Sequence, residues 1–362
     1  MEKLARPSVW KIKPYIPGKP IEEVKRELGI EGEIIKLASN ENPLGPSPKA
    51  IEALKRAVEE VHLYPDDTCY YLKKKLASRL GVEENMIFVG SGSVEIIHYI
   101  TTAFLNPGER VIMGKPSFIM GKIESQIMEG EVVEVEAKNY TTDIDGMIKE
   151  MSERTKIVYL DNPNNPLGSM VKKEDVERLV KSAPEDTIVV IDEAYHEYID
   201  RTKTPDSVGY VREGRNVIVL RTFSKIYGLA GLRIGYAISK PEIIDVLNRV
   251  RLPFNVGRLS QIAALAALDD EEHVERSRKL VEKEREFLYQ EFEKLEIPYI
   301  RSETNFITID TGKDGQEVFK ELQRRGVIVR PLTPYGLPTH IRITIGTHEQ
   351  NIKLMEALRE VL

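Results

Sequence analysis

Lys225 is the residue of this sequence best placed to do chemistry, because hydroxyl groups and a guanidinium lie close to it in the chain. Thr222 and Ser224 precede it, and Arg233 follows. Residues 216–220 are apolar and β-branched, which favours a buried strand just before the lysine. Strand ends are where open α/β sheets bind ligands, and an amine there can be a nucleophile. A lysine in a glycine-containing loop is usually an ordinary surface residue, so the case for chemistry rests on the other strand ends.

Polar residues follow three further predicted strands. The glycine-rich turn at 90–95 precedes a helix, where free N–H groups favour anions. It lacks a P-loop ending and the last glycine of a dinucleotide fingerprint, so an ordinary turn is the alternative. The turn at 161–168, which contains Asn165, is explained equally well by its turn-forming residues. Asp192 and Tyr195 follow a third strand, where a helix N-cap and a core residue are the alternatives.

The residues at these strand ends form a set that suits one cofactor. They supply a phosphate cup, an amide, a carboxylate, a tyrosine, and hydroxyls with a lysine. Pyridoxal phosphate requires a lysine for its Schiff base, a carboxylate beside its pyridine nitrogen, donors for its phenolate oxygen and a phosphate site. The sequence therefore favours a pyridoxal-phosphate enzyme.

The elements that must position these residues alternate regularly from Asn85 onward. Short apolar runs alternate with amphipathic segments, which predicts an α/β fold with a doubly wound, mostly parallel sheet and helices on both faces. Strands are expected at 86–89, 110–113, 131–135, 156–160, 187–191 and 216–220. Helices are expected at 94–105, 144–151 and 173–182, with another beginning at Ser117.

The pattern changes after Pro253. A helix over 258–268 and a long amphipathic helix ending near Leu295 precede strand-like pieces, which predicts a smaller α+β domain. The segment before Pro46 is rich in proline and glycine and is expected to form an arm packing on that domain. The predicted division is an N-terminal arm at 1–45, a large pyridoxal-phosphate-binding domain at 46–254 and a small C-terminal domain at 255–362.

Composition and charge argue against several classes of function. The net charge of −6 comes from acidic and basic residues mixed along 362 positions, so neither nucleic acid nor membrane is an expected partner. Cys69 is the only cysteine and the six histidines are scattered, so we expect no disulfide and no metal. The N-terminus lacks the apolar region of a signal peptide, and we expect a cytoplasmic protein.

The sequence resembles the fold-type I pyridoxal-phosphate aminotransferases from end to end, and within them the histidinol-phosphate branch. The motifs that carry the general resemblance lie at 15–18, 37–46, 64–66, 90–95, 162–168, 192–195 and 221–236. The runs at 249–256 (RVRLPFNV) and 327–332 (VIVRPL) point to the histidinol-phosphate branch.

The resemblance implies a role for each matching position toward the cofactor. Lys225 corresponds to the Schiff-base lysine and Asp192 to the partner of the pyridinium nitrogen. Asn165 and Tyr195 correspond to the donors that hold the phenolate oxygen. Phe118, where the family frequently has tyrosine, would stack on the ring. The cofactor phosphate would be held by Gly92, Ser93, Val94, Thr222, Ser224 and Arg233, and Tyr64 would reach the phosphate of the neighbouring subunit's cofactor in a homodimer.

Substrate recognition is implied in the same way. Arg330 and Arg342 would bind substrate anions, and Tyr15 would close the pocket. A guanidinium fork suits both a carboxylate and a phosphate, as an enzyme with two unlike substrates requires. The sequence departs from the family at Val94, which replaces a usual aspartate, and at Leu167, which replaces a common threonine.

The resemblance implies an aminotransferase of histidine biosynthesis. It would exchange an amino group between histidinol phosphate or imidazole acetol phosphate and glutamate or 2-oxoglutarate. An aromatic amino acid aminotransferase is one alternative, since the same pocket could admit a flat ring with a carboxylate. A lyase similar to threonine-phosphate decarboxylase would share the cofactor residues and release carbon dioxide. An effector domain of a regulator is disfavoured, because no helix-turn-helix module fits within the arm.

Overall fold

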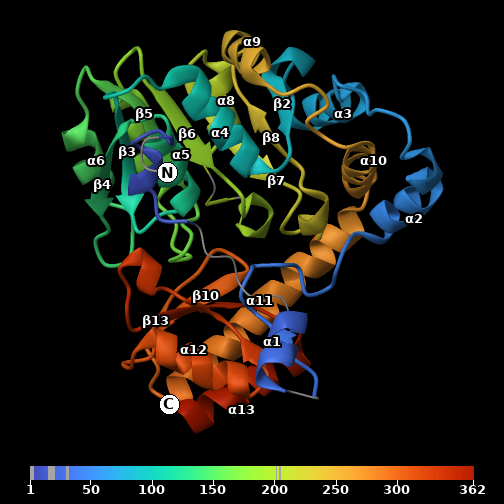
Figure 1. Ribbon diagram of the computed structural model, residues 1–362, viewed down its shortest axis with the longest axis vertical. Coiled ribbons are helices and arrows are strands. Elements are labelled where there is room, and N and C mark those ends of the chain that lie inside the picture. Colours follow the sequence, from blue (N-terminus) through green and yellow to red (C-terminus); the bar gives the residue numbers. More distant parts are fainter. Residues whose placement is uncertain (1–3, 15–20, 30–31, 201, 204) are drawn as a thin grey trace.

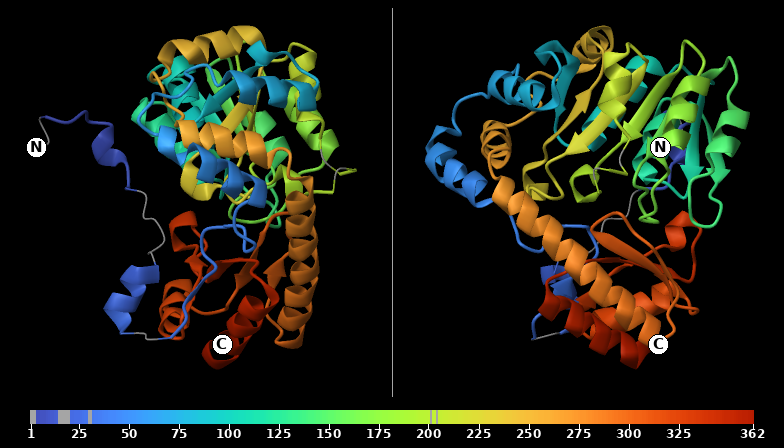
Figure 2. Two further views of the ribbon diagram at one scale, coloured as in Figure 1. Left: turned by 90° about the vertical axis from the view of Figure 1, so that its right-hand side faces the viewer. Right: turned by 180° about the vertical axis from the view of Figure 1, so that it is seen from behind.

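The computed structural model describes residues 4–14, 21–29, 32–200, 202–203 and 205–362. One part is built around a large sheet and the other around a smaller sheet, as Figure 1 shows. The long helix α11 (Glu271–Lys294) extends from one part to the other, which is clearest from behind in Figure 2. Tyr15, which is predicted to close the substrate pocket, lies outside the described residues.

The large sheet has seven strands in the order β2-β8-β7-β6-β5-β3-β4. These strands are β2 (Ile87–Gly90), β3 (Arg110–Lys115), β4 (Glu131–Glu136), β5 (Thr155–Asp161), β6 (Ile188–Asp192), β7 (Val217–Thr222) and β8 (Gly235–Ile238). The strands from β7 to β4 pair in parallel, whereas β8 is antiparallel to both β2 and β7. The predicted α/β fold with a mostly parallel sheet is therefore confirmed.

Strand β8 is the member of this sheet that the sequence pattern does not reveal. It begins at Gly235, directly after a turn-like run, and lies between β2 and β7. A Cβ atom at Gly235 would lie 2.8 Å from the backbone nitrogen of Ser93 and 2.9 Å from the carbonyl oxygen of Arg221. Glycine is therefore required where β8 passes between β7 and the start of α4 (Ser93–Phe104).

Helices cover both faces of the large sheet. The strands are buried on both sides, so their side chains alternate between two apolar cores. On β5, Ile157 and Tyr159 join the core beneath α4, whereas Val158 and Leu160 join the core on the other face. The first face carries α4, α5 (Ile119–Ile127) and α9 (Pro241–Val250), and the second carries α6 (Ile144–Glu150), α7 (Lys173–Ser182) and α8 (Ser207–Arg212).

The smaller sheet has four strands in the order β12-β13-β10-β9, all paired antiparallel. They are β9 (Tyr299–Ile300), β10 (Phe306–Asp310), β12 (Arg330–Pro331) and β13 (His340–Thr344), accompanied by α11, α12 (Gly315–Arg324) and α13 (His348–Val361). A separate two-residue strand, β1 (Ile35–Lys36), pairs in parallel with β11 (Val327–Ile328). On α1 (Ile21–Leu28), Val24 packs against Ile328, which brings the N-terminal segment to this part of the molecule.

Three helices form a group beside the large sheet. Helix α10 (Arg258–Ala267) packs against α2 (Pro48–Ala57) and α3 (Tyr70–Leu80). The division into an arm and two domains stays a prediction. Helix α10 follows the predicted boundary at residue 254 in the chain, yet it packs against α2 and α3, which precede that boundary. Short 3-10 helices complete the described chain at Val9–Lys11, Val58–Glu60, Glu84–Met86, His196–Tyr198, Ala230–Leu232 and Thr333–Tyr335.

Two searches of the described residues bear on partners. None of the helices found there combines the length and the apolar character needed to cross a membrane. The same residues hold no group of three or more His, Cys, Asp or Glu side chains arranged to bind a metal ion.

Candidate active site

A cavity of about 150 Å³ lies where the carboxyl ends of β5, β6 and β7 meet the start of α4. Parallel strands present their carboxyl ends at one edge of a sheet, so residues distant in sequence converge there. The lining includes the predicted residues Ser93, Val94, Phe118, Asn165, Asp192, Tyr195, Thr222, Ser224, Lys225 and Arg233. Asp161, Pro163 and Ala194 also line the cavity.

Lys225 follows β7, and its side chain enters the cavity. The Nζ atom donates a hydrogen bond to the carbonyl oxygen of Ser39 at 3.2 Å and lies 5.6 Å from the centre of the Tyr195 ring. Burial lowers the pKa of Lys225 to about 7, and the guanidinium of Arg342 contributes in the same direction. An amine with such a pKa is about half uncharged at neutral pH, so it is available as a nucleophile and as a base.

Asp192 ends β6 and is almost fully buried. Its carboxylate accepts hydrogen bonds from the Tyr159 hydroxyl at 2.7 Å and from the backbone nitrogen of Ala194 at 3.2 Å. Burial raises the pKa of Asp192 to about 6, because neither of these neutral donors compensates its charge. The carboxylate can therefore accept a positively charged partner in the cavity.

Asn165 and Tyr195 are connected to the smaller sheet and to the N-terminal segment. Arg342, on β13, donates from Nη1 to Oδ1 of Asn165 and from Nη2 to the carbonyl oxygen of Ala38 at 2.8 Å. The Tyr195 hydroxyl accepts a hydrogen bond from Nδ2 of Asn40 at 2.8 Å. Burial raises the pKa of Tyr195, so its hydroxyl stays protonated and can donate. These contacts place Arg342 at the edge of the cavity.

The predicted phosphate ligands surround the first turn of α4. This helix begins at Ser93, so the first N–H groups have no partner within the helix and attract anions. Arg233 Nη1 donates to the Ser224 hydroxyl at 3.4 Å and to the carbonyl oxygen of Ala230 at 3.0 Å. A Cβ atom at Gly92 would lie 2.5 Å from Nη2 of Arg233, so only glycine permits this approach. The result is a cationic cup open to an anion.

Asp161 has a central position that the sequence does not reveal. Its carboxylate accepts hydrogen bonds from the Ser117 hydroxyl at 2.7 Å and from the backbone nitrogens of Phe118 at 3.1 Å and Asn165 at 2.9 Å. Burial raises the pKa of Asp161 to about 7. It thereby fixes the loop that carries Phe118 relative to the loop that carries Asn165. The sequence signal that could identify Asp161 is its position at the end of β5, directly beside Asp192 in the sheet.

Of the predicted residues that the structure describes, four do not line the cavity: Gly92 and Arg342, which contact lining residues, and Tyr64 and Arg330. Tyr64 is 79% exposed, and its ring stacks on Phe254 with ring centres 4.7 Å apart. Arg330 pairs with Arg342 across β12 and β13 but is not among the described residues that line the cavity. Tyr159 and Asn40, which contact Asp192 and Tyr195, cannot be identified from the sequence, because neither contact leaves a local pattern.

Comparison with known proteins defines the class. Residues 32–358 match the family described as aminotransferase class I and II, and the chain belongs to this family. The fold agrees: a Thermus thermophilus aspartate aminotransferase double mutant superposes with a TM-score of 0.84 at 25% identity, covering 99% of each chain. The prediction of a fold-type I transferase is therefore confirmed.

Several of the proteins similar to this chain are named histidinol-phosphate aminotransferase. The chain is 51% identical to the histidinol-phosphate aminotransferase of Caldicellulosiruptor saccharolyticus, over 97% of this chain and 98% of that protein. It is 48% identical to the enzyme of the same name from Moorella thermoacetica, over 99% of this chain and 92% of that one. The crystal structure of histidinol-phosphate aminotransferase from Sinorhizobium meliloti, in complex with pyridoxal-5'-phosphate, superposes with a TM-score of 0.91 at 28% identity, covering 99% and 97%.

Proposed function

We propose that this chain is a pyridoxal-phosphate-dependent aminotransferase of histidine biosynthesis that acts on histidinol phosphate. It exchanges an amino group between histidinol phosphate or imidazole acetol phosphate and glutamate or 2-oxoglutarate. The observation that carries the proposal is the convergence of a buried lysine of lowered pKa, a buried carboxylate and an anion cup in one cavity. The identity of about half with enzymes of that name supports the choice of substrate.

The residues present fit pyridoxal phosphate. Lys225 supplies the amine for covalent attachment, and the Asp192 carboxylate lies in the same cavity for the pyridine nitrogen. The first turn of α4 with Thr222, Ser224 and Arg233 supplies donors and positive charge for the phosphate. When bound, this cofactor supplies an aldehyde that accepts and releases an amino group and a ring that withdraws electrons from the substrate's α carbon.

The side chains then have separate tasks. Lys225 would take the proton from the substrate carbon that bears the amino group, because its pKa of about 7 leaves about half of the amine uncharged at neutral pH. Asp192 would hold a proton on the pyridine nitrogen of the cofactor. Asn165 and Tyr195 would donate hydrogen bonds to its phenolate oxygen. Phe118, whose backbone nitrogen donates to Asp161, would stack on the ring.

Arginine side chains select the substrates. Arg342 lies at the cavity edge, where its guanidinium suits the carboxylate of glutamate or 2-oxoglutarate. Arg330, its neighbour across the smaller sheet, is proposed to bind the phosphate of histidinol phosphate, with Tyr15 closing the pocket. The two anions are thereby assigned to two guanidinium groups on adjacent strands.

The proposal includes a homodimer in the cytoplasm, in which Tyr64 reaches the cofactor phosphate of the neighbouring subunit. Support comes from exposed apolar side chains around Tyr64, which a partner would remove from water. They are Val61, Leu63 and Phe254. Sedimentation analysis should show a dimer, and Tyr64→Phe should weaken the binding of pyridoxal phosphate. A monomer with full affinity would contradict this part of the proposal.

A spectral experiment tests the choice of substrate. The protein loaded with pyridoxal phosphate should show the absorbance band of the lysine-bound cofactor, and histidinol phosphate without an amino acceptor should abolish it. Phenylalanine at the same concentration should leave the band in place. A faster change with phenylalanine would favour an aromatic aminotransferase, and release of carbon dioxide from threonine phosphate would favour a lyase.

A further inference from the structure

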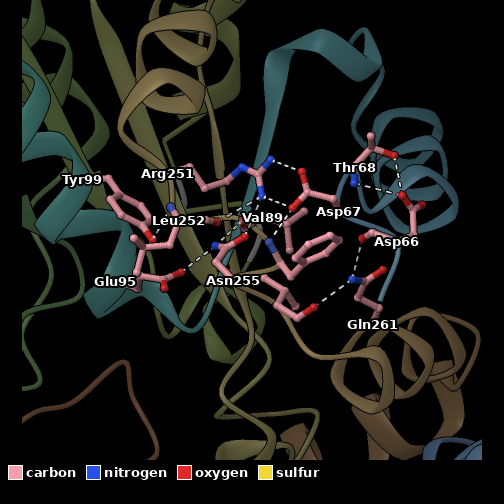
Figure 3. Close-up of polar contacts among 12 residues, drawn as sticks. Asp66, Asp67, Thr68, Val89, Glu95, Tyr99, Arg251, Leu252, Asn255 and Gln261 are labelled. Atoms are coloured by element: carbon pink, nitrogen blue, oxygen red, sulfur yellow. Dashed lines mark hydrogen bonds and ion pairs between the residues drawn. The ribbon is translucent and has the colours of Figure 1, made fainter. Parts of the chain in front are cut away.

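A chain of polar contacts connects Asp67, Arg251, Asn255 and Glu95, which are far apart in sequence (Figure 3). The guanidinium of Arg251 donates two hydrogen bonds to the carboxylate of Asp67, from Nη1 to Oδ1 at 2.8 Å and from Nη2 to Oδ2 at 2.6 Å. Nη1 also donates to Oδ1 of Asn255 at 3.1 Å. The guanidinium is largely buried, and such bidentate pairs fix geometry as well as charge.

Asn255 connects Arg251 to the turn that precedes α4. Its Nδ2 donates to Oε2 of Glu95 at 2.7 Å, and the same oxygen accepts from the backbone nitrogen of Ser91 at 2.6 Å. With its Oδ1 occupied by Arg251, the amide of Asn255 must present its Nδ2 to Glu95. Arg251 therefore sets the orientation of Asn255, and Asn255 sets that of Glu95.

This arrangement determines which N–H groups of the turn remain for a ligand. The N–H of Ser91 is bonded to Glu95, and the N–H of Gly92 is bonded to the carbonyl oxygen of Gly90 at 2.8 Å. Ser93 and Val94 lie in the first turn of α4, where N–H groups have no partner within the helix. The turn is thus held in one conformation in the protein alone, which lowers the entropy cost of binding an anion.

The segment around Arg251 is anchored independently of the cup. Asp67 also accepts from the backbone nitrogen of Phe254, and the hydrogen bond from Arg251 lowers the pKa of Asp67 to about 2. The backbone nitrogen of Leu252 donates to the Tyr99 hydroxyl on α4 at 3.2 Å. The segment at 251–255 is therefore fastened to α4 by contacts that do not involve the cavity.

We propose that Arg251 and Asn255 are positioning residues for the cofactor phosphate, acting through Glu95 on the turn at 90–94. The inference rests on the proposed use of pyridoxal phosphate and names residues of that site which touch neither the cofactor nor the substrate. Because the relay acts on the phosphate cup alone, its loss reduces the preference for pyridoxal phosphate over pyridoxal, which lacks the phosphate.

The test compares Kd values of the cofactor-free protein for pyridoxal phosphate and for pyridoxal, measured by absorbance titration. Asn255→Leu removes the link to Glu95 while keeping the branch point of the side chain, and should weaken the binding of pyridoxal phosphate about tenfold while changing the binding of pyridoxal less than about twofold. Arg249→Met is the matched control, since Arg249 is an exposed arginine of the same segment that pairs with Asp245. It should change neither value.

Each result has a defined meaning. If the unmodified protein does not prefer pyridoxal phosphate to pyridoxal, the proposed function fails. If it does, and Asn255→Leu keeps the same ratio of Kd values, this inference alone is overturned. Should thermal melting show that Asn255→Leu is unfolded, Arg251→Lys replaces it, because lysine keeps the charge but cannot grip Asp67 and Asn255 together. A ratio unchanged in that variant overturns the inference equally.

Discussion

Asp192 and Glu193 are sequence neighbours at the end of β6, both buried, yet their surroundings differ. The Oε2 atom of Glu193 accepts a hydrogen bond from Nε of Arg221 at 2.9 Å and forms an ion pair with Nη2 of the same guanidinium, also at 2.9 Å. Burial alone would raise the pKa of Glu193, but the charges of Arg221 and His196 together with hydrogen bonds from Ser207 and Arg221 outweigh it, and the pKa is lowered. Among the described residues, the hydrogen-bond donors to the Asp192 carboxylate are a neutral hydroxyl and a backbone N–H, and burial raises the pKa of Asp192 to about 6.

The comparison separates a structural carboxylate from a chemically available one. Burial is common to both residues, so burial does not define the site. What distinguishes the cavity is that burial outweighs the favourable interactions of its ionisable groups: Asp192 and Asp161 have raised pKa values, and Lys225 has a lowered one. Such groups are costly in a folded protein unless a ligand completes them, which is why they indicate function.

The largest effect is expected at Lys225. Replacing Lys225 by Ala removes the covalent anchor and the base together, and should lower steady-state turnover of histidinol phosphate by at least about 10⁴-fold. Lys181→Ala, on the exposed face of α7, is the control and should retain full activity. Substantial turnover by the Lys225 variant would refute the assignment of the cavity as the active site.

Asp192→Asn tests the available carboxylate. The amide keeps the size of the side chain but cannot hold a proton on the pyridine nitrogen, so turnover should fall by about 10²- to 10³-fold. The free energy of unfolding of the cofactor-free protein should not fall, because no ion pair is lost and a buried charge disfavoured by its surroundings is removed. Rates and urea unfolding measured on one preparation check both parts, and a stable, fully active variant would contradict the role.

Glu193→Gln should show the opposite pattern. It leaves the buried guanidinium of Arg221 without its counter-charge, so the free energy of unfolding should fall by about 3 to 5 kcal/mol. Activity of the molecules that remain folded should change far less than in Asp192→Asn. Equal losses of activity in the two variants would remove the distinction between the neighbours.

The parts of the fold and of the site whose sequence signal is local could be predicted from the sequence. Ser47 followed by Pro48 is a sequence pattern typical of a helix start, and in the structure the Ser47 hydroxyl accepts a hydrogen bond from the backbone nitrogen of Ala50 at the start of α2. The predicted helix at 173–182 has the same bounds as α7. The residues that follow β6 and β7 were placed at one cavity because parallel strands must end at the same edge.

What could not be predicted depends on contacts between distant segments. The partner of Glu193 is fixed by strand pairing rather than by spacing, and so is the contact of Tyr159 with Asp192. Asp161 looks like an ordinary turn residue until the loop carrying Phe118 packs on it. The roles of Tyr64, Arg330 and Tyr15 stay predictions, since they concern a partner subunit, a substrate and a residue outside the described structure.

The smallest expected effect concerns pH. Because the pKa of Lys225 is lowered to about 7, the amine is protonated and unreactive below that pH and uncharged above it. The rate constant for covalent capture of pyridoxal by the cofactor-free protein should therefore rise about tenfold per pH unit below 7 and level off above it. Pyridoxal is used because it has no phosphate to titrate in the same range. A rate that keeps rising to pH 10, as for an exposed lysine, would show that Lys225 is not desolvated and would remove the contrast with compensated charges such as Glu193.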